Sequence, residues 1–330
     1  MALIELTKQG LYCAQADVYI DPWKAVPKAL ITHAHSDHAR SGNGLYVAQE
    51  NCIPLLDLRL GKINSQGLKY GESIHCNGVQ ISFHPAGHVP GSSQIRLEYK
   101  GEVWVISGDY KLEDDRVCAP FDSVKCHSFI SESTFGLPIY RWKNQYEVYS
   151  EINRWWKQNA ADGIVSVIMA YSLGKAQRIL KHLDQEIGKV IVHPVVGAMN
   201  AAVRNFTPDL PADLIWHKDL TVSNYRNALL IVPPNSAQSM LEMFHPCSIA
   251  FASGWMNFRG GKYQMSAERG FTLSDHADWD GLNKAIDASG AEKVFITHGF
   301  TNPYVKWLRE QGKDAHELET LFSSHMESEE

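Results

Sequence analysis

A short histidine-rich segment, residues 33–38 with the sequence HAHSDH, has the side chains best suited to bind metal ions. It directly follows an apolar run, so these groups would lie where a strand ends at the rim of a sheet. Because residues two apart in extended backbone point the same way, His33 and His35 can bind one ion, while Asp37 and His38, displaced by the turn that follows, face a second. Imidazole and carboxylate ligands without thiolates favour zinc, with manganese or iron as alternatives. The competing interpretation is a polar surface loop that contains histidines.

Two ions need more ligands than these four, and three further residues occupy similar places. His88 lies in the glycine-rich segment PAGHVPGS, Asp109 follows an apolar run at 103–107, and His298 follows another at 294–297. The two carboxylate oxygens of Asp109 could bridge both ions. Each residue alone could equally be a capping aspartate or an ordinary loop histidine. Their common place after apolar strands favours a metal site.

Several segments together resemble the motifs of a known family. HAHSDH (33–38), PAGHVPGSSQ (85–94) and SGDY (107–110) resemble the metal-binding motifs of the metallo-β-lactamase fold. ISESTFG (130–136), LSDHAD (273–278) and ITHG (296–299) resemble motifs A, B and C of the β-CASP nucleases, which include Artemis-type DNA nucleases and the pre-mRNA cleavage and RNase J-type RNA nucleases. Within this branch the chain is similar to the bacterial ligase-associated DNA exonucleases of the DNA damage response. The resemblance covers essentially the whole chain.

The resemblance implies a role for each of these residues. Seven of them would bind two divalent ions, with Zn²⁺ expected and Mn²⁺ as the alternative: His33, His35 and His88 the first ion, Asp37, His38 and His298 the second, and Asp109 both. Glu132 and His276 match a carboxylate–histidine pair beside the ions. His276 would act as general acid for the expelled 3′-oxygen, and Glu132 would hold its ring in the protonated form. Asp37, Glu132 and His276 are therefore expected to be catalytic.

The elements that must position these residues change in character along the chain. Up to about residue 125, short apolar or alternating runs broken by Gly, Asn and Pro predict strands at Ala29–Thr32, Gly44–Ala48, Val79–His84, Gln94–Tyr99 and Val103–Ser107. Strands and helices then alternate, with helices expected at Asn144–Asn159, from Gly174 and at Ala237–Phe244, and strands at Ile164–Ala170, Lys189–His193, Ala228–Val232 and Ser248–Ala252. Strand Lys293–Thr297 and helix Asn302–Gln311 complete the pattern.

This order predicts an α/β protein with an inserted domain. The resemblance implies that residues 1–140 and 259–322 form the αββα sandwich of the metallo-β-lactamase fold. A smaller α/β domain, the β-CASP domain, would occupy residues 141–258, and the polar tail at 323–330 is expected to be flexible.

The inserted segment also offers groups for a nucleic-acid chain. Lys175 follows a strand and a glycine-containing turn at a predicted helix start, where free N–H groups and the helix dipole favour a phosphate. Arg259 and Lys262 are interleaved with aromatic residues and glycines, as in a track for single strands. Arg141 lies beside a tryptophan in a similar way. An ordinary strand–helix connection and buried tryptophans would explain the same residues, and Trp155–Trp156 are better explained as core.

Composition limits the class of protein. The 330 residues are 44% hydrophobic and 21% charged, which excludes wholesale disorder and low-complexity folds. The formal charge of −6 means that a polyanion must bind through a local basic groove. Six cysteines without a CxxC pair indicate reduced, mostly buried thiols. The N-terminal residues lack the apolar run of a signal peptide, and no stretch reaches the length of a membrane span, so we expect a cytoplasmic protein without membrane contact.

These observations predict a two-metal phosphodiesterase. We expect a DNA exonuclease that acts in repair on single-stranded or end-located DNA, leaves 5′-phosphate and 3′-hydroxyl ends, and works with an ATP-dependent DNA ligase and a helicase. An RNA-processing nuclease is the first alternative, since motif C usually has valine in Artemis-type DNA enzymes and histidine in RNA enzymes, and this chain has His298. If the chain were a small-molecule ester or lactam hydrolase, Glu132 and His276 would have no role in the reaction. A non-catalytic scaffold is disfavoured by the complete set of ligands.

Overall fold

The computed structural model describes residues 2–220, 225–236, 244, 246–257, 267–318 and 320. The chain divides into two compact units, and each is described by itself. Unit 1 consists of Met1–Arg141 together with the residues from His276 onward, and unit 2 consists of Trp142–Asp275. Unit 1 therefore combines segments from both ends of the sequence. The predicted domain boundaries stay a prediction, and residues 258–266 lie outside the described part of the chain.

Unit 1 contains two sheets among its described residues. Sheet A has six strands in the order β1-β2-β3-β4-β5-β6: β1 (Glu5–Thr7), β2 (Gly10–Cys13), β3 (Val18–Ile20), β4 (Lys28–Leu30), β5 (Leu45–Gln49) and β6 (Ser65–Leu68). Its first three strands are antiparallel neighbours, and the pairs from β3 to β6 are parallel. Helix α1 (Ile53–Leu60) connects β5 to β6 and contacts β6.

Sheet B has seven strands within the described residues, in the order β19-β18-β11-β10-β9-β8-β7: β7 (Ser73–Cys76), β8 (Val79–Pro85), β9 (Ser93–Tyr99), β10 (Glu102–Ile106), β11 (Ser128–Ser133), β18 (Lys293–Gly299) and β19 (Asp314–Glu317). The strands from β7 to β10 pair antiparallel, and those from β10 to β19 pair parallel. Because β18 pairs directly with β11, the sheet joins residues about 165 positions apart in the sequence.

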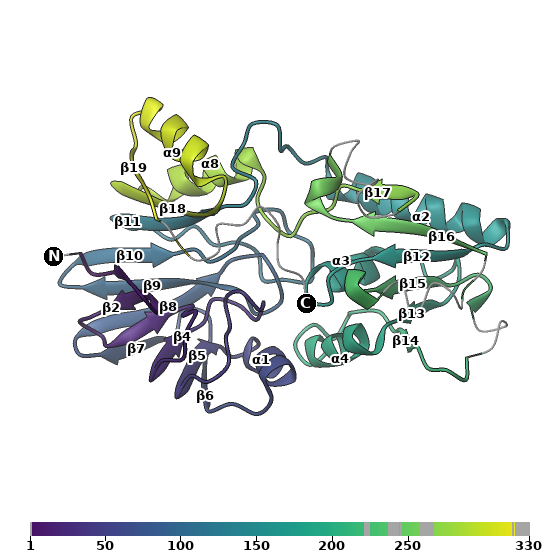
Figure 1. Cartoon of the computed structure of the whole chain (residues 1–330), viewed down its shortest axis with the longest axis horizontal. Coiled ribbons are helices and arrows are strands. Elements are labelled where there is room, and N and C mark those ends of the chain that lie inside the picture. The colour runs from purple at the N-terminus through teal and green to yellow at the C-terminus, as the bar shows by residue number, and fades with distance from the viewer. Residues whose placement is uncertain are drawn as a thin grey trace. The chain divides into compact units, whose positions relative to one another are not determined.

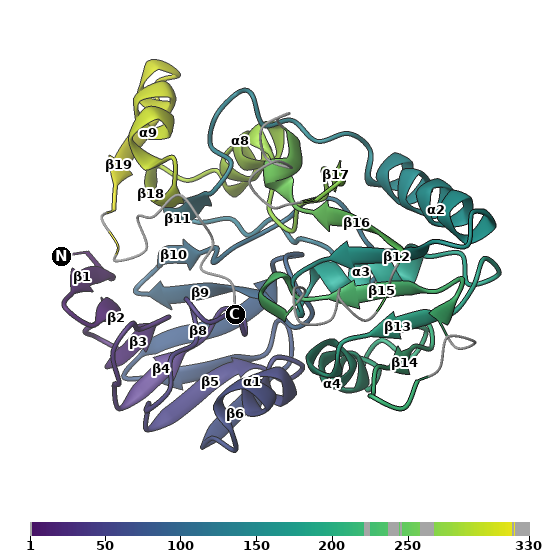
Figure 2. The same cartoon turned by 45° about the vertical axis from the view of Figure 1, so that its right-hand side comes forward.

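Alternate side chains of sheet B enter two different cores. Trp104 and Ile106 of β10 belong to an apolar cluster shared with the strands of sheet A, while Val103 and Val105 belong to a second cluster. The second cluster also contains the buried faces of α8 (Trp279–Ser289), which contacts β11, and of α9 (Thr301–Glu310), which lies beside β18 in Figures 1 and 2. One face of sheet B thus packs against sheet A and the other against these two helices, as expected for strands with apolar residues on both faces.

Unit 2 contains sheet C, whose six strands within the described residues all run parallel. Their order is β14 (Leu214–Ile215), β13 (Val190–Val192), β15 (Leu229–Val232), β12 (Val165–Met169), β16 (Cys247–Ala252) and β17 (Arg269–Phe271). The central strands β12 and β15 are buried along their whole length, which is typical of a parallel sheet covered on both faces. Within the described residues, the helices of this unit are α2 (Gln145–Ala161), α3 (Lys175–His182), α4 (Pro194–Val203) and the short 3₁₀ helix Gly254–Asn257.

Most of the predicted elements are present, with shifted ends. The strand predicted at Ala29–Thr32 is β4, which ends at Leu30, so the HAHSDH segment begins in a loop rather than in extended backbone. The predicted helix at Asn144–Asn159 is α2, and Trp155 and Trp156 are buried in the core as expected. The predicted helix at Ala237–Phe244 and the tail at 323–330 lie outside the described residues, apart from Phe244. All six cysteines are free thiols.

Among the described residues we find no helix with the length and apolar character of a membrane span.

Candidate metal centre

The HAHSDH segment forms a compact turn after β4. The backbone N–H groups of His38 and Ala39 both donate to the carbonyl of His35, at 3.3 and 2.9 Å. A turn at Asp37 and His38 was expected, but His33 and His35 were expected in extended backbone, and β4 ends before the first histidine. As a result the ring of His33 lies beside both His35 and His38, with ring centroids 4.8 and 4.2 Å away.

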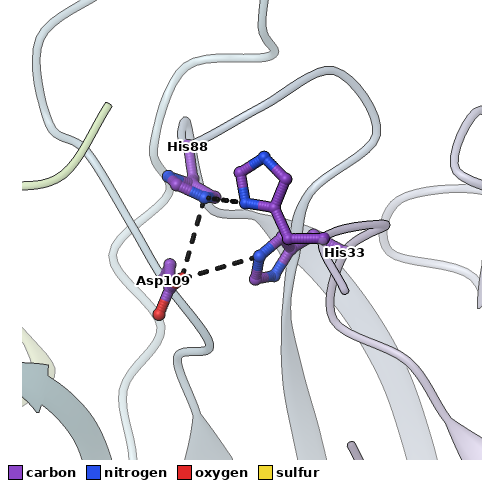
Figure 3. A group of neighbouring side chains, drawn as sticks. His33, His88 and Asp109 are labelled. Atoms are coloured by element: carbon purple, nitrogen blue, oxygen red, sulfur yellow. Dashed lines mark hydrogen bonds and ion pairs between the residues drawn. The ribbon is translucent and has the colours of Figure 1, made fainter. Parts of the chain in front are cut away.

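The carboxylate of Asp109 lies at the centre of the histidines. Its Oδ2 is 3.3 Å from Nε2 of His38, 3.5 Å from Nε2 of His33 and 3.7 Å from Nε2 of His88. Figure 3 shows the imidazoles of His33 and His88 directed toward this carboxylate. Asp109 follows the end of β10, and His88 lies in the turn between β8 and β9. Three separate segments of the sequence therefore meet at one carboxylate oxygen.

Two further predicted ligands complete compact groups around this centre. Nδ1 of His35 lies 3.1 Å from Nε2 of His88, and Oδ2 of Asp37 lies 3.7 Å from Nε2 of His38. Three sets of potential ligand atoms in the described residues each lie within 4.8 Å of one another: His33, His35, His88 and Asp109; His33, Asp37 and His38; and Asp109, Glu132 and His276.

His298 reaches the same region from the C-terminal end of β18. Its ring stacks on that of His38, with centroids 5.1 Å apart and an interplanar angle of 17°. It belongs to none of the ligand groups that lie within 4.8 Å of one another in the described residues. The structure thus places His298 beside His38, which is one of the proposed ligands of the second ion.

Glu132 and His276 form a buried pair next to the histidines. Nδ1 of His276 lies 2.9 and 3.0 Å from the two carboxylate oxygens of Glu132, which is 1% exposed. Oε1 of Glu132 also accepts a hydrogen bond of 2.8 Å from the backbone N–H of Tyr110. The ring of His276 lies 4.6 Å from that of His88. The carboxylate therefore fixes the orientation of an imidazole at the edge of the candidate metal centre.

Several ring and carboxylate atoms at the centre of the cluster make no hydrogen bond within the described part of the chain and could therefore bind a cation. Among the described residues, Nε2 of His33, Nε2 of His38 and Oδ1 of Asp109 are buried and make no hydrogen bond. The opposite ring nitrogens are held from outside, with Nδ1 of His33 3.0 Å from the Thr32 hydroxyl and Nδ1 of His38 2.7 Å from Asp21. Burying such atoms without partners is unfavourable by about 1–3 kcal/mol each. A bound divalent cation would remove this penalty, so the donor set fits a metal site.

The pKa shifts of the clustered residues indicate the same position for a cation. Burial lowers the pKa of His33 and of His298, and His38 lowers both further. Burial also lowers the pKa of His38, but Asp109 and Asp37 outweigh it and raise that pKa well above its usual value. Burial raises the pKa of Asp109, but positive charge on His38 outweighs this and holds the pKa well below its usual value. Positive charge is therefore favoured between Asp37 and Asp109, where the second ion is expected.

Sequence reasoning missed Asp21, which follows β3. Its Oδ2 lies 2.7 Å from Nδ1 of His38 and accepts a 2.6 Å hydrogen bond from the hydroxyl of Thr32, while its Oδ1 accepts from the backbone N–H of Thr32 at 2.8 Å. A carboxylate on the far nitrogen of a metal-binding histidine orients the ring and increases its basicity. No strand pattern marked Asp21 in the sequence, because β3 has only three residues.

The predicted substrate-binding residues have varied surroundings. Lys175 is 2% exposed, its Nζ lies 2.9 Å from Asp275, and it lies over the ring of Tyr171. Arg141 is exposed and pairs with Asp280. Arg259 and Lys262 lie outside the described residues. A role in substrate binding stays a prediction for all four.

Comparisons with known proteins found relatives that are named as a DNA ligase, a cleavage factor and an RNase J-like protein. It is 29% identical over 311 residues to a probable DNA ligase of Opitutus terrae, covering 93% of this chain and 30% of that protein. It is 28% identical over 134 residues to the cleavage and polyadenylation specificity factor subunit 3 of Dictyostelium discoideum, covering 39% of this chain and 16% of that protein. It is 24% identical over 192 residues to an RNase J-like protein of Methanocaldococcus jannaschii, covering 50% and 45%. The chain thus spans less than half the length of these relatives.

The fold has a counterpart among solved structures, while no family model matches the chain. A protein of unknown function from Enterococcus faecalis V583 superposes with a TM-score of 0.60 at 12% sequence identity, covering 90% of this chain and 80% of that one. At this identity the likeness concerns the fold alone. The sequence relatives confirm the predicted resemblance of this chain to the β-CASP nucleases of the metallo-β-lactamase fold.

Proposed function

We propose that the chain is a two-metal nuclease that hydrolyses phosphodiester bonds of DNA. It would act as an exonuclease on single-stranded or end-located DNA in repair, with an αββα sandwich of the metallo-β-lactamase fold and an inserted β-CASP domain. The observation that carries this proposal is the convergence of His33, His38 and His88 on one oxygen of Asp109, with the Glu132–His276 pair beside them. The names of the relatives, which include cleavage factors and RNase J, support nuclease chemistry.

The proposed mechanism divides the work between the ions and the buried pair. Two divalent ions, Zn²⁺ or else Mn²⁺, would activate the attacking water and neutralise charge on the phosphate. Asp37, Asp109 and the histidines would hold them. Glu132 binds Nδ1 of His276, so that Nε2 can carry the proton that the departing 3′-oxygen takes. Breaking the bond between phosphorus and the 3′-oxygen leaves a 5′-phosphate on one fragment and a 3′-hydroxyl on the other.

The first experiment compares DNA and RNA substrates of the same sequence. The zinc- or manganese-loaded protein is expected to shorten end-labelled single-stranded DNA and to lose activity in chelator. A His276→Ala variant should retain its ions but turn over about 10²–10⁴ times more slowly, because the general acid is lost. His316→Ala, which changes a surface histidine of the same unit, serves as the control. Normal cleavage by the His276→Ala variant would contradict the proposed roles.

An RNA-processing nuclease is the second candidate, and two observations favour it. His298 occupies the motif C position that is usually histidine in RNA enzymes. Several relatives are named as RNA nucleases, among them the RNase J-like protein and an endoribonuclease of Gibberella zeae that is 27% identical over 187 residues. An advantage of about a hundredfold for RNA over matched DNA, roughly 2.7 kcal/mol in transition-state binding, would establish this candidate instead.

The proposed partners are an ATP-dependent DNA ligase and a helicase of the same pathway. Support comes from the Opitutus relative, which is named as a probable DNA ligase and of which this chain spans 30%. Size-exclusion chromatography of the purified chain with a DNA ligase from the same source would test this association, with co-elution as the expected result.

A further inference from the structure

Strands β11 and β18 pair in parallel, but their register shifts at the end nearest the candidate metal centre. Glu132 is opposite Thr297, and the next residue of β11, Ser133, is opposite Gly299. Strand β18 therefore has one more residue than β11 at this point, and that residue is His298. Such a bulge bends its strand and changes the direction of the side chain that it carries. Here that side chain is the ring that stacks on His38.

The backbone of this bulge is strained at His298. Its φ angle is +55°, in the left-handed region that few residues other than glycine adopt, although asparagine, aspartate and histidine occur there more often than other residues. A strained conformation of this kind persists only where the surrounding structure determines it, and it is found mostly at functional sites. Some contact must therefore hold His298 in this conformation.

Ser133 supplies that contact from the neighbouring strand. Its side chain is fully buried, and its hydroxyl donates a hydrogen bond to the backbone carbonyl of His298. Its own carbonyl accepts hydrogen bonds of 2.9 Å from the backbone N–H groups of Phe300 and Gly136, so the residue is fixed on both sides. A Cβ atom at Gly299 would lie 2.3 Å from the Ser133 carbonyl oxygen and 2.4 Å from Cα of Thr134, so only glycine allows this close approach.

We propose that Ser133 is a positioning residue for the second metal ion. Its hydroxyl holds the carbonyl of His298, and thereby the left-handed bulge that turns the imidazole toward His38 and Asp37. The proposal rests on the two-metal function proposed above. It is selective, because no contact of the Ser133 side chain described here reaches His33, His35 or His88, the proposed ligands of the first ion.

The test is a metal titration of a Ser133→Ala variant, followed by calorimetry and by counting bound zinc. The second ion is expected to bind about 10–100 times more weakly, as when other supporting hydrogen bonds of metal ligands are removed, while the first binds as in the wild type. Turnover at limiting zinc should fall and recover with excess zinc, and KM for DNA should not change. Ser131→Ala is the matched control, because Ser131 is equally buried on the same strand but bonds to Tyr110 and to the carbonyl of Glu132.

The outcomes separate this inference from the proposed function. A His298→Ala variant that still binds two ions with wild-type affinity would overturn the assignment of the ligands. If His298→Ala loses one ion while Ser133→Ala binds both with wild-type constants, the role of Ser133 is refuted and the two-metal site stands. Equal weakening of both ions would also refute it. Ser133→Cys retains the shape of the side chain but donates a weaker hydrogen bond, and it is measured in parallel. It replaces the alanine variant if that variant does not fold. Its affinity for the second ion alone should fall.

Discussion

His38 lies between two carboxylates, with Nδ1 2.7 Å from Asp21 and Nε2 3.3 Å from Asp109. One nitrogen is anchored and the other is directed toward the centre of the cluster. The residue types and their positions after apolar strands were sufficient to predict this neighbourhood, because strand ends place side chains at a common rim. They could not predict which nitrogen faces inward, since that depends on Asp21, which is 17 residues away and folds against the turn.

The role of Asp21 predicts the effect of an Asp21→Asn substitution. The variant keeps the size of the side chain but removes the negative charge that supports His38, so affinity for the second zinc ion should fall about 10–100-fold. Equilibrium dialysis against buffered zinc measures this change. Asp314→Asn, at a half-exposed carboxylate of the same unit, should bind zinc as the wild type does. Equal zinc affinity of the Asp21→Asn variant and the wild type would contradict this role.

The raised pKa of His38 predicts the pH dependence of the metal-free protein. Because the folded chain holds this proton more tightly than the unfolded chain, the stabilisation is fully present below the unfolded pKa of about 6.5 and is lost as the pH rises through the raised pKa. The lowered pKa of Asp109 affects stability in a different pH range, since its contribution to the free energy of unfolding is lost only as the pH falls through that lowered value. Urea unfolding in chelator should therefore show a His38→Gln variant destabilised most near pH 6 and progressively less toward pH 10. A constant difference across this range would contradict the assignment.

At the scale of elements, the turns between strands determine where the ligands lie. The turn between β8 and β9 holds His88 through a 3.1 Å hydrogen bond from its backbone N–H to the hydroxyl of Ser92. Short apolar or alternating runs made β8, β9 and β10 predictable. Three-residue strands such as β1 and β3 are too short to show a period and depend on tertiary pairing. The bulge at His298 was also beyond sequence reasoning, because it arises from the pairing of β18 with β11.

The tight turn at Gly87 predicts a clear difference between two glycines. Gly87 and Gly71 have similar φ angles of +73° and +77°, but a Cβ at Gly87 would lie 2.2 Å from the carbonyl oxygen of Lys111, whereas one at Gly71 would meet nothing within 4 Å. Gly71→Ala should lower the free energy of unfolding by about 1–2 kcal/mol through backbone strain alone. Gly87→Ala should lower it further and weaken zinc binding, because it displaces the turn that carries His88. Similar urea midpoints and zinc affinities for both variants would count against this explanation.

The buried start of α3 predicts a structural effect of Lys175. Its ammonium bonds to Asp275, which also pairs with Arg178. Lys175→Met should therefore lower the free energy of unfolding by about 1.5–3 kcal/mol, the range for hydrogen bonds to charged groups. Lys181→Met removes a pair with a largely exposed carboxylate and should leave the free energy of unfolding nearly unchanged. Unchanged stability of the Lys175→Met variant with weaker DNA binding would contradict this and would support the substrate role that the sequence suggested.

At the scale of the whole molecule, one unit assembles its site from both ends of the chain. His33 and His38 precede the segment 142–275 in the sequence, and His276 and His298 follow it. Motif-like segments occur on both sides of residues 142–275, and they predicted that both ends of the sequence contribute to one site. The residues that would contact the nucleic acid could not be predicted in the same way, because cations on a surface carry no periodic or spacing signal and can equally serve as ion-pair partners, as Lys175 and Arg141 do.

The most direct test of the account is a crystal structure of the zinc-loaded protein with anomalous data collected at the zinc edge. We predict two anomalous peaks about 3.5–4 Å apart, with Asp109 between them. His33, His35 and His88 should bind the first ion, and Asp37, His38 and His298 the second. A single peak, or a second peak away from His298, would contradict the two-metal site on which the proposed function depends.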